Sequence, residues 1–502
     1  MAVRRPLVLL IAPLLFTASC AEQTPFTAVD AASSRIRDFA PAPIEPGRYL
    51  VGFDGDAVIA DDVLHASGGR IIDSIPEFNV LVVDDVMNPD ALLAASPRYI
   101  EAGFDVSVEP IMGDDATPVD DEAVAAAVPG AESTPWYASN VQWGMRAVQA
   151  DEGWALTSGG EGINICIVDS GMDMLHQELA GKVTLRANFV VAEPRLDDPN
   201  GHGSHVAGIA AAQGVVVNGV APRASLLGAR VLNAANSGTE TAIVNGIRWC
   251  ADNGAHVINA SLGGLRYRGQ ASFISSPITY GAAINYATSR GTVVVVSDGN
   301  SNLQKPNPQV ITVPAEVPGV ITVGATGPLT RSTAPMPPLW DPFNPEHVWH
   351  SPDTKAFYSN FGTGVTVFAP GGRGGIPLSA TYRFVNRIQQ GSVHDAIWSV
   401  CSGNSPNSGA ANVGGVPSGN APCSGTTNRY WAINGTSMAA PHVSGMAAVL
   451  YGEIGGERSV ANRARIEACI RTTTDDIGSS SIYGGGRVNV RKAVEAIRSG
   501  SC

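Results

Sequence analysis

The sequence has few charged side chains for its length. Asp, Glu, Lys and Arg make up 15% of the 502 residues, whereas hydrophobic residues make up 44%. Disordered chains have the opposite balance, so we expect most of the chain to fold around a buried core. Basic residues are also scarce: 32 Lys and Arg stand against 45 Asp and Glu, which gives a net charge of −13. Because nucleic acids are bound by clustered Lys and Arg, we expect no nucleic-acid partner.

Long apolar runs and collagen-like repeats are also missing. No segment has 18 uninterrupted apolar residues, which excludes a transmembrane helix. The 56 glycines follow no Gly-X-Y period, which excludes collagen. The N-terminus does carry a short apolar stretch, from Leu7 to Phe16, after the basic residues Arg4 and Arg5. Such a stretch is too short to cross a bilayer and predicts a signal peptide over residues 1–20.

The end of this segment leaves two alternatives open. Residues 17–20 (Thr-Ala-Ser-Cys) resemble the lipobox of bacterial lipoproteins, in which the cysteine, here Cys20, is lipidated. The alternative is ordinary secretory cleavage nearby. Both predict export, either as a secreted protein or as one in the periplasm or cell envelope. The first also predicts a precursor anchored to a membrane by its lipid.

The remaining cysteines number six, an even count that permits three disulfides in an exported chain. Cys401 and Cys423 bracket a loop rich in Gly, Ser and Asn and are the easiest pair to propose. Cys166 lies inside an apolar run, where the alternative is a buried thiol. The six are Cys166, Cys250, Cys401, Cys423, Cys469 and Cys502.

Composition and periodicity divide the chain into segments. An Ala/Pro/Ser-rich linker over 21–46 precedes a small α+β unit over 47–110. An acidic, Pro/Ala-rich linker over 111–135 then offers a site for proteolytic cutting. From 136 to 502 strands and helices alternate, which predicts a doubly wound α/β domain with a mostly parallel sheet. We expect strands at 49–53, 79–83, 163–168, 224–231, 257–261 and 292–296, and helices at 89–95 and 239–251.

Three motifs in the α/β segment carry chemistry. Residues 168–171 (VDSG) put Asp169 at the carboxyl end of a strand, where α/β sheets place their binding groups. Residues 200–208 (NGHGSHVAG) put His202 at the start of a helix, and residues 434–445 (NGTSMAAPHVSG) do the same for Ser437. Each has an ordinary alternative: a helix cap, a loop histidine, or a weak His202–His205 metal pair. Together they give one of the known orders of a catalytic triad, Asp, His, Ser.

With these motifs the chain from 136 to 502 resembles the subtilisin-like serine proteases, the subtilases. Further matches are Ser261-Leu262-Gly263-Gly264, Pro314-Ala315, Ser359-Asn360-Phe361-Gly362 and Ala369-Pro370-Gly371. The resemblance implies a serine endopeptidase that hydrolyses peptide bonds of protein or peptide substrates, acting as a monomer. In this role Ser437 is the nucleophile, His202 the general base, and Asp169 the group that orients His202. The alternative is a catalytically inactive subtilase-fold binding protein.

The resemblance also assigns residues that bind the substrate. Asn300 would donate to the oxyanion together with the Ser437 backbone. The substrate would bind as an extra strand between two edges of the cleft, Asn236-Ser237-Gly238 and Ser261-Leu262-Gly263.

Four features depart from the family pattern. Ser204 replaces the usual Thr and Asn434 the usual Ser, and both changes are mild. Asp298 stands where a small apolar residue is usual, so we expect negative charge near the oxyanion or the specificity pocket, with a changed rate or residue preference. Residues 371–430 are longer than usual and predict a surface insertion, pinned by Cys401–Cys423.

Two expectations concern activation and metals. Residues 47–110 resemble the inhibitory propeptide of subtilases, which implies a self-processing zymogen cut within 111–135 and inhibited by its own propeptide; the alternative is an unrelated α+β module. The family's tight calcium site uses a loop after the helix of the catalytic His. Residues 210–219 form a short loop without a carboxylate, whereas tight Ca²⁺ sites need about 6–8 oxygen ligands. We therefore expect this site to be absent or weakened and assign no metal ligand, with Glu178 left as a ligand for calcium elsewhere.

Overall fold

The structure is a computed structural model of the whole chain, and it describes ten segments. All of them fall within one compact unit, Ala42–Cys502. No helix among these segments is both long enough and apolar enough to cross a bilayer. The described residues are 47–75, 79–97, 99–102, 105–107, 142–154, 156–270, 272–327, 354–372, 396–403 and 429–502.

The first segments form a small antiparallel sheet in the order β2-β3-β1-β4. Its strands alternate between two faces, as strand geometry requires. Tyr49, Val51 and Val83 pack on one face, against Leu92 of η3. Leu50, Val80 and Val82 on the other face join a core cluster that includes residues of the larger part of the chain. The elements are β1 (Gly47–Gly52), α2 (Asp61–Ser67), β2 (Arg70–Ile75), β3 (Val80–Val86), η3 (Pro89–Ala95) and β4 (Tyr99–Ala102).

The two strands predicted in this region are therefore present. The predicted short helix at 89–95 is confirmed, and Pro89–Ala95 is of the 3-10 type. The segment has only seven residues and is closed by Ser96 in the left-handed conformation. A short piece of this kind often takes the tighter 3-10 form.

The larger part of the chain is built on one sheet in the order β16-β15-β12-β10-β6-β8-β7, with β18 beside β15. Its neighbouring strands run parallel, except that β16 is antiparallel to β15. The predicted doubly wound, mostly parallel α/β fold is confirmed. The strands are β6 (Asn164–Asp169), β7 (Val183–Asn188), β8 (Ser225–Arg230), β10 (Val257–Ala260), β12 (Val293–Ser297), β15 (Val320–Gly327), β16 (Thr354–Lys355) and β18 (Val367–Pro370).

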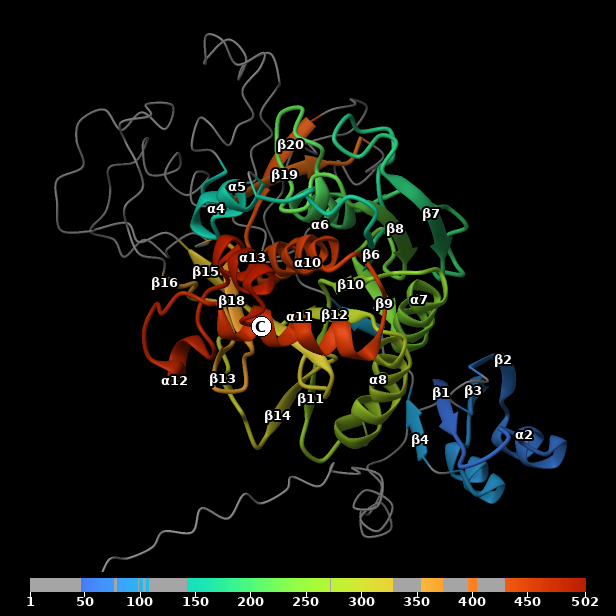
Figure 1. Cartoon of the computed structure of the whole chain (residues 1–502). Helices are drawn as coiled ribbons and strands as arrows, with labels where there is room; N and C mark the ends of the chain where they lie inside the picture. Colours follow the sequence, from blue (N-terminus) through green and yellow to red (C-terminus); the bar gives the residue numbers. More distant parts are fainter. Residues whose placement is uncertain are drawn as a thin grey trace, which may run out of the picture. The chain divides into compact units, whose positions relative to one another are not determined.

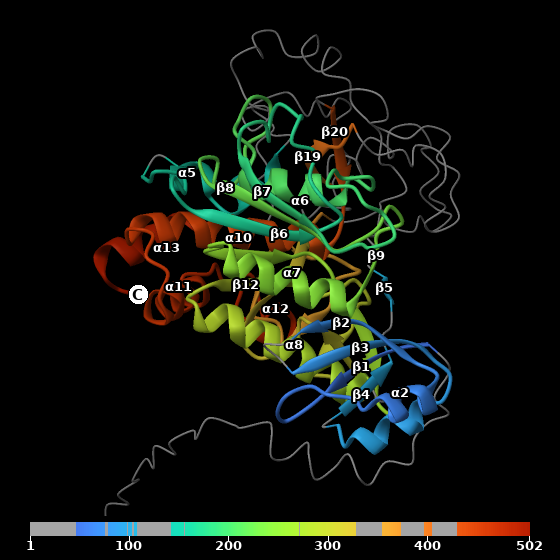
Figure 2. The ribbon, with the colours of Figure 1, turned by 90° about the vertical axis from the view of Figure 1, so that its right-hand side faces the viewer.

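Helices cover both faces of this sheet (Figures 1 and 2). Along β6, Ile165 and Ile167 face the core under α6 and α10, while Cys166 and Val168 face the core under α7 and α8. Both faces are apolar, so the strand is a continuous hydrophobic run, as buried parallel strands are. The helices are α4 (Trp143–Ala147), α5 (Ala150–Trp154), α6 (His202–Ala211), α7 (Glu240–Asp252), α8 (Ser272–Ser289), α10 (Thr436–Glu453), α11 (Val460–Thr472), α12 (Ser480–Tyr483) and α13 (Val490–Ser499).

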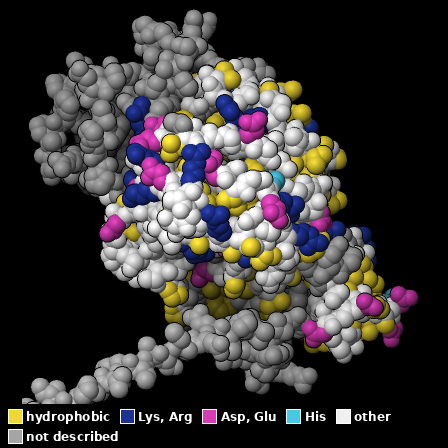
Figure 3. All heavy atoms as spheres, viewed as in Figure 1, with side chains coloured by type: hydrophobic (Ala, Val, Ile, Leu, Met, Phe, Trp, Pro, Cys, Tyr) yellow, Lys and Arg dark blue, Asp and Glu magenta, His cyan; other side chains and the backbone are white. Residues whose placement is uncertain are grey.

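Short strand pairs lie outside the main sheet. β5 pairs with β9, β11 with β14, β13 with β17, and β19 with β20. On the face shown in Figure 3, basic and acidic side chains are interspersed. The strands are β5 (Asp105–Ser107), β9 (Ser237–Thr239), β11 (Gly264–Tyr267), β13 (Gln304–Lys305), β14 (Val310–Val313), β17 (Phe361–Gly362), β19 (Ile397–Cys401) and β20 (Arg429–Ile433).

Two disulfides join described elements. Cys166 in β6 is bonded to Cys250 in α7, so the alternative of a buried thiol at Cys166 is wrong. Cys469 in α11 is bonded to Cys502 at the end of the chain. Cys401 is also disulfide-bonded, but its proposed partner Cys423 lies outside the described residues.

The surface-insertion interpretation of 371–430 is wrong for strand β19. All five residues of Ile397–Cys401 are buried. Ser399 Oγ donates to His205 O at 2.8 Å, and a Cβ at Gly208 would come within 2.2 Å of Ser399 Oγ. β19 therefore packs tightly against α6, the helix that begins with His202, because Gly208 has no side chain at the point of contact.

Candidate active site

The three predicted catalytic residues come from elements that open toward one edge of the sheet. Asp169 is the last residue of β6, His202 begins α6, and Ser437 is the second residue of α10. In an α/β sheet, the carboxyl ends of the strands and the amino ends of the following helices share an edge. The structure brings Asp169 and His202 into direct contact there.

The contact between them is a buried hydrogen bond. His202 Nδ1 lies 2.8 Å from Asp169 Oδ1, and the two side chains are 1% and 0% exposed. Burial by itself would lower the pKa of His202, but the Asp169 carboxylate, helped by Asp198, raises this pKa above its ordinary value. The second ring nitrogen, Nε2, is buried and has no hydrogen-bond partner. His202 is therefore oriented by Asp169 and has one nitrogen left to take a proton.

Asp198 is a site residue that the sequence reasoning missed. Its buried carboxylate accepts hydrogen bonds from Ser170 Oγ at 2.8 Å and from Ser204 Oγ at 2.6 Å, and from the backbone N–H groups of Asn200, Gly201 and Ser204. Burial raises the pKa of Asp198, and these donors oppose the rise. Because Ser170 follows Asp169 and Ser204 lies two residues after His202, Asp198 ties the two catalytic segments together. The position of Asp198 four residues before His202 was the sequence feature that could have indicated its role.

Close backbone packing at this point also explains two motif residues. A Cβ on Gly203 would lie 2.2 Å from Gly171 O and 3.2 Å from Asp169 Cβ, so glycine is required for the helix to approach the strand. The Ser204 hydroxyl donates to Asp198 and accepts from Asp173 N. A threonine would supply the same hydroxyl, which is why the departure at Ser204 is mild.

Ser437 lies beside the strand end of β10. Its Oγ donates to Ser261 O at 3.2 Å, and Ser261 Oγ donates back to Ser437 O at 2.8 Å. Asn259 Nδ2 in turn donates to Ser261 Oγ at 2.9 Å. Ser437 and His202 are not hydrogen-bonded to each other, since Ser437 Oγ donates to Ser261 O and His202 Nε2 has no partner. In enzymes without substrate, hydrogen bonds between catalytic groups are often long and shorten only when substrate binds.

Asn300 is oriented by the start of α10. Its Oδ1 accepts from Thr436 N and from Thr436 Oγ1, both at 2.9 Å. A Cβ placed on Gly435 would lie 3.7 Å from both Asn300 Nδ2 and Ser437 N. The amide and the backbone N–H therefore border one small space beside Ser437, the arrangement an oxyanion site needs.

One predicted substrate edge is occupied by the chain's own residues. Strand β5 pairs antiparallel with β9, with Asp105 opposite Thr239, Val106 opposite Gly238 and Ser107 opposite Ser237. Asn236 enters this edge with φ of 62°, and a Cβ on Gly238 would lie 2.4 Å from Val231 O. The edge therefore accepts an extended strand. Ser261, Leu262 and Gly263 directly follow β10.

Asp298, which the sequence analysis expected to add negative charge near Asn300, is paired with a buried lysine. Its side chain is fully buried, and Oδ1 lies 2.6 Å from Nζ of the equally buried Lys305. Burial raises the pKa of Asp298 to about 7, although Lys305 opposes this rise. The same ammonium also pairs with Glu316 at 2.9 Å, so it offsets the charge of Asp298 only in part, and the expected change in rate or residue preference stays a prediction.

Glu178, which the sequence analysis left as a ligand for calcium, is surrounded by hydrogen-bond donors. Both oxygens of the buried Glu178 carboxylate accept backbone N–H groups, from residues 214–217 at 2.6–3.0 Å. Tyr430 OH also donates to Glu178, at 2.9 Å. N–H groups point toward Glu178 where a cation would need further oxygens.

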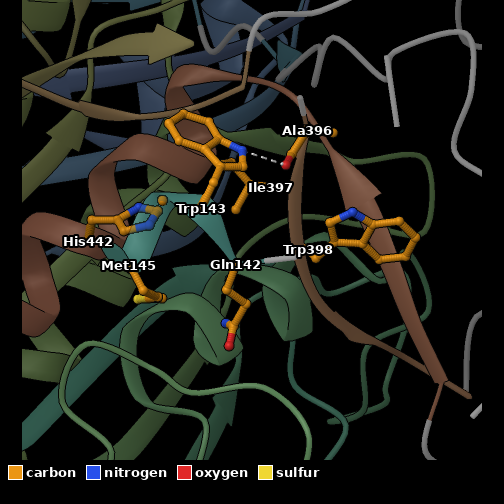
Figure 4. Close-up of a pocket in the computed structure, with 8 residues that line it drawn as sticks. Gln142, Trp143, Met145, Ala396, Ile397, Trp398 and His442 are labelled. Atoms are coloured by element: carbon orange, nitrogen blue, oxygen red, sulfur yellow. Dashed lines mark hydrogen bonds between the residues drawn. The ribbon is translucent and has the colours of Figure 1, made fainter. Parts of the chain in front are cut away.

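His442, in the same motif as Ser437, belongs to a separate small pocket (Figure 4). The pocket is lined by His442, Trp143, Ile397 and neighbouring residues. His442 Nδ1 lies 2.8 Å from Met438 O, and burial lowers the pKa of His442 to about 4. A neutral, buried imidazole held within its own helix is a packing residue.

The described residues form a mostly parallel α/β domain in which Asp169 contacts His202 and Ser437 lies at the start of α10. Residues 160–486 match the Subtilase family, so the chain belongs to it and is a serine endopeptidase. The chain is 33% identical to thermitase of Thermoactinomyces vulgaris over 72% of its length and 98% of that protein. It is 30% identical to subtilisin Savinase of Lederbergia lenta over 71% and 99%. The leader-peptide-processing protease EpiP of Staphylococcus aureus shares the fold, with a TM-score of 0.64, 20% identity and coverage of 90% and 98%.

Proposed function

We propose that Asp169, His202 and Ser437 form the catalytic triad of a secreted, self-processing endopeptidase. The observation that carries this proposal is the buried 2.8 Å contact between His202 Nδ1 and Asp169 Oδ1, which leaves Nε2 without a partner. A base held in this way can activate a weak hydroxyl nucleophile.

The reaction follows from this geometry. Ser437 Oγ leaves its contact with Ser261 O and attacks the peptide carbonyl carbon, while its proton passes to His202 Nε2. The carbonyl oxygen becomes an oxyanion that accepts hydrogen bonds from Asn300 Nδ2 and Ser437 N. His202 then gives the proton to the leaving amine as the C–N bond breaks, and water releases the acyl group by the reverse sequence. Asp169 stabilises the imidazolium throughout.

Residues 47–110 act as the propeptide in this proposal. Support comes from β5, which lies on the edge of β9 where a substrate strand would bind. A chain segment on that edge blocks the cleft until it is cut and released. The cut is proposed within 111–135, which lies outside the described residues.

The test is to express wild type and Ser437→Ala without added protease. We expect the wild type to yield a mature chain that an organofluorophosphate labels. Ser437→Ala should stay as a folded full-length precursor, and trace wild-type enzyme should cut it in trans. Processing of the mutant alone would refute self-processing. A wild type that is neither processed nor labelled would favour the inactive binding protein.

Export and anchoring are proposed from the N-terminal segment, which lies outside the described residues. If Cys20 is lipidated, the lipid stays with the propeptide side of the cut, because acyl chains retain only what is covalently attached. Uncut Ser437→Ala should then pellet with membranes while the wild-type catalytic part remains in the soluble fraction. A soluble mutant precursor would show an ordinary secretory signal.

A further inference from the structure

The loop that carries Asn300 runs from Asp298 to Lys305, and a buried ion cluster joins its two ends. Lys305 Nζ lies 2.6 Å from Asp298 Oδ1 and 2.9 Å from Glu316 Oε1. The Lys305 and Asp298 side chains are 1% and 0% exposed, and that of Glu316 is 18% exposed. We propose that Lys305 is a positioning residue that holds the Asn300 amide in place for the oxyanion. This inference rests on the proposed function.

The loop is fixed at both ends and closed from within. Asp298 N donates to Val323 O of β15 at 3.0 Å, and Lys305 pairs with Gly362 in the β13–β17 ladder. Asn360 Nδ2 donates to Asp298 O at 2.6 Å, and Lys305 Nζ approaches the same oxygen at 3.4 Å. Lys305 is therefore the side chain that ties the far end of the loop to its beginning.

Asn360 supports the middle of the same loop. Its Oδ1 accepts from Ser301 N at 3.2 Å and from Leu303 N at 2.9 Å. The Asn360 amide and the Lys305 ammonium together restrict the backbone conformation of the residues that follow Asn300. Asn300 itself meets Thr436 at the start of α10, so a shift of the loop would move its amide relative to Ser437 N.

Glu316 connects the cluster to strand β14. Glu316 Oε1 also accepts from Thr312 N, at 2.8 Å. The methyl group of Thr312 lies between Gly299 of the Asn300 loop and Gly263 of the predicted substrate edge. A Cβ on Gly299 would be 3.4 Å from this methyl group, and a Cβ on Gly263 would be 3.6 Å from it. Through Glu316, Lys305 therefore connects the loop that carries Asn300 to Thr312 in β14, and Thr312 lies next to Gly263 of the predicted substrate edge.

Geometry explains this buried charge better than stability does. A buried ion pair is often no more stabilising than apolar side chains of similar volume, but it demands a defined distance and direction. With Lys305 removed, Asp298 loses its cation, and burial already raises the pKa of Asp298 to about 7. A carboxyl group without its partner would be expelled or protonated, and either change relaxes the loop. A displacement of about 1 Å at such a donor costs on the order of 10²-fold in rate.

The test is a double-mutant cycle between Lys305→Met and Asn300→Ala. Variants are matured in trans by tagged wild-type enzyme that is then removed, and kcat and KM are measured on a chromogenic peptide selected from a library. We expect Lys305→Met to lower kcat about 10- to 100-fold with little change in KM. In the Asn300→Ala background the same change should cost less than about threefold, because the amide it positions is gone. Lys305→Arg should keep most of the activity.

Controls separate positioning from damage to the fold. Lys182→Met removes another buried lysine, whose Nζ donates to Pro222 O at 2.7 Å, and should leave kcat unchanged. Organofluorophosphate titration counts the competent sites. If Lys305→Met does not fold, the variant Asp298→Ala/Lys305→Met/Glu316→Gln, which removes all three charges of the cluster, is put through the same cycle. An unchanged kcat, or an equal loss in both backgrounds, would overturn the inference. A wild type without Ser437-dependent activity would instead overturn the proposed function.

Discussion

Two buried aspartates, Asp198 and Asp298, lie on either side of the candidate active site and are satisfied in different ways. Asp198, near His202, accepts five hydrogen bonds from neutral hydroxyl and N–H donors. Asp298, near Asn300, has one oxygen on the ammonium of Lys305 and another without a hydrogen-bond partner. Neutral donors stabilise a carboxylate and leave its charge in place, whereas the Lys305 ammonium, which Asp298 shares with Glu316, offsets part of that charge.

The difference matches what each side must stabilise during the proposed reaction. Positive charge develops on His202, and the uncancelled charge of Asp198 helps to raise the pKa of His202. Negative charge develops beside Asn300, where an uncancelled Asp298 would oppose it. A buried aspartate can therefore lie beside a developing positive charge or beside a developing negative charge, because its partners decide how much of its own charge remains.

Removing the side chain of Asp198 should have the largest effect. Asp198→Ala leaves buried donors on Ser170, Ser204 and Gly201 unpaired, at about 1–3 kcal/mol each. We expect the unfolding free energy to fall by about 3–5 kcal/mol, measured by urea denaturation. Asp298→Ala/Lys305→Met/Glu316→Gln removes the whole ion cluster, so it should cost less than about 1.5 kcal/mol. Equal losses in the two variants would show that the two aspartates are held alike.

A change of charge at Asp198 should have a smaller effect, on the pH profile. His202 must be neutral to accept a proton, so activity falls as the pH drops through the pKa of His202. Because Asp198 raises this pKa, Asp198→Asn should move the acid limb of kcat/KM to lower pH. Asp298→Asn is the matched control and should leave the limb in place. An acid limb that stays unmoved in Asp198→Asn would contradict a charge effect on His202.

The smallest effect is expected from metal removal. Glu178 resembles Asp198 in that neutral donors satisfy its buried carboxylate. We propose that these N–H groups replace the tight calcium of the family, so a chelator should change the Tm by less than about 2 °C. Glu178→Gln should lower the Tm with or without chelator, because an amide cannot accept all of these hydrogen bonds. A large loss of Tm in chelator alone would contradict the proposal.

Much of the fold was predictable because its signals are local. The strand now observed as Val293–Ser297 was expected from a run of valines, and α7 from its apolar spacing. Pro89–Ala95 was expected as a short helix, but seven residues carry too little period to predict that it is a 3-10 helix. Strand β19 was mistaken for surface, since its burial depends on Gly208 of α6, about 190 positions earlier, which leaves room for it.

The sequence by itself was enough to predict the class of this protein, a subtilisin-like serine endopeptidase. Asp169, His202 and Ser437 stand in motifs whose glycines and helix starts are local requirements, and these motifs can be identified without coordinates. Tertiary structure decided how charges are compensated around them. Nothing local in the sequence shows that Lys305 reaches back to Asp298, or that Glu178 meets the backbone of residues 214–217. Such contacts depend on how loops close in space. The pKa and the net charge of a buried group depend on the partners that the fold places beside it.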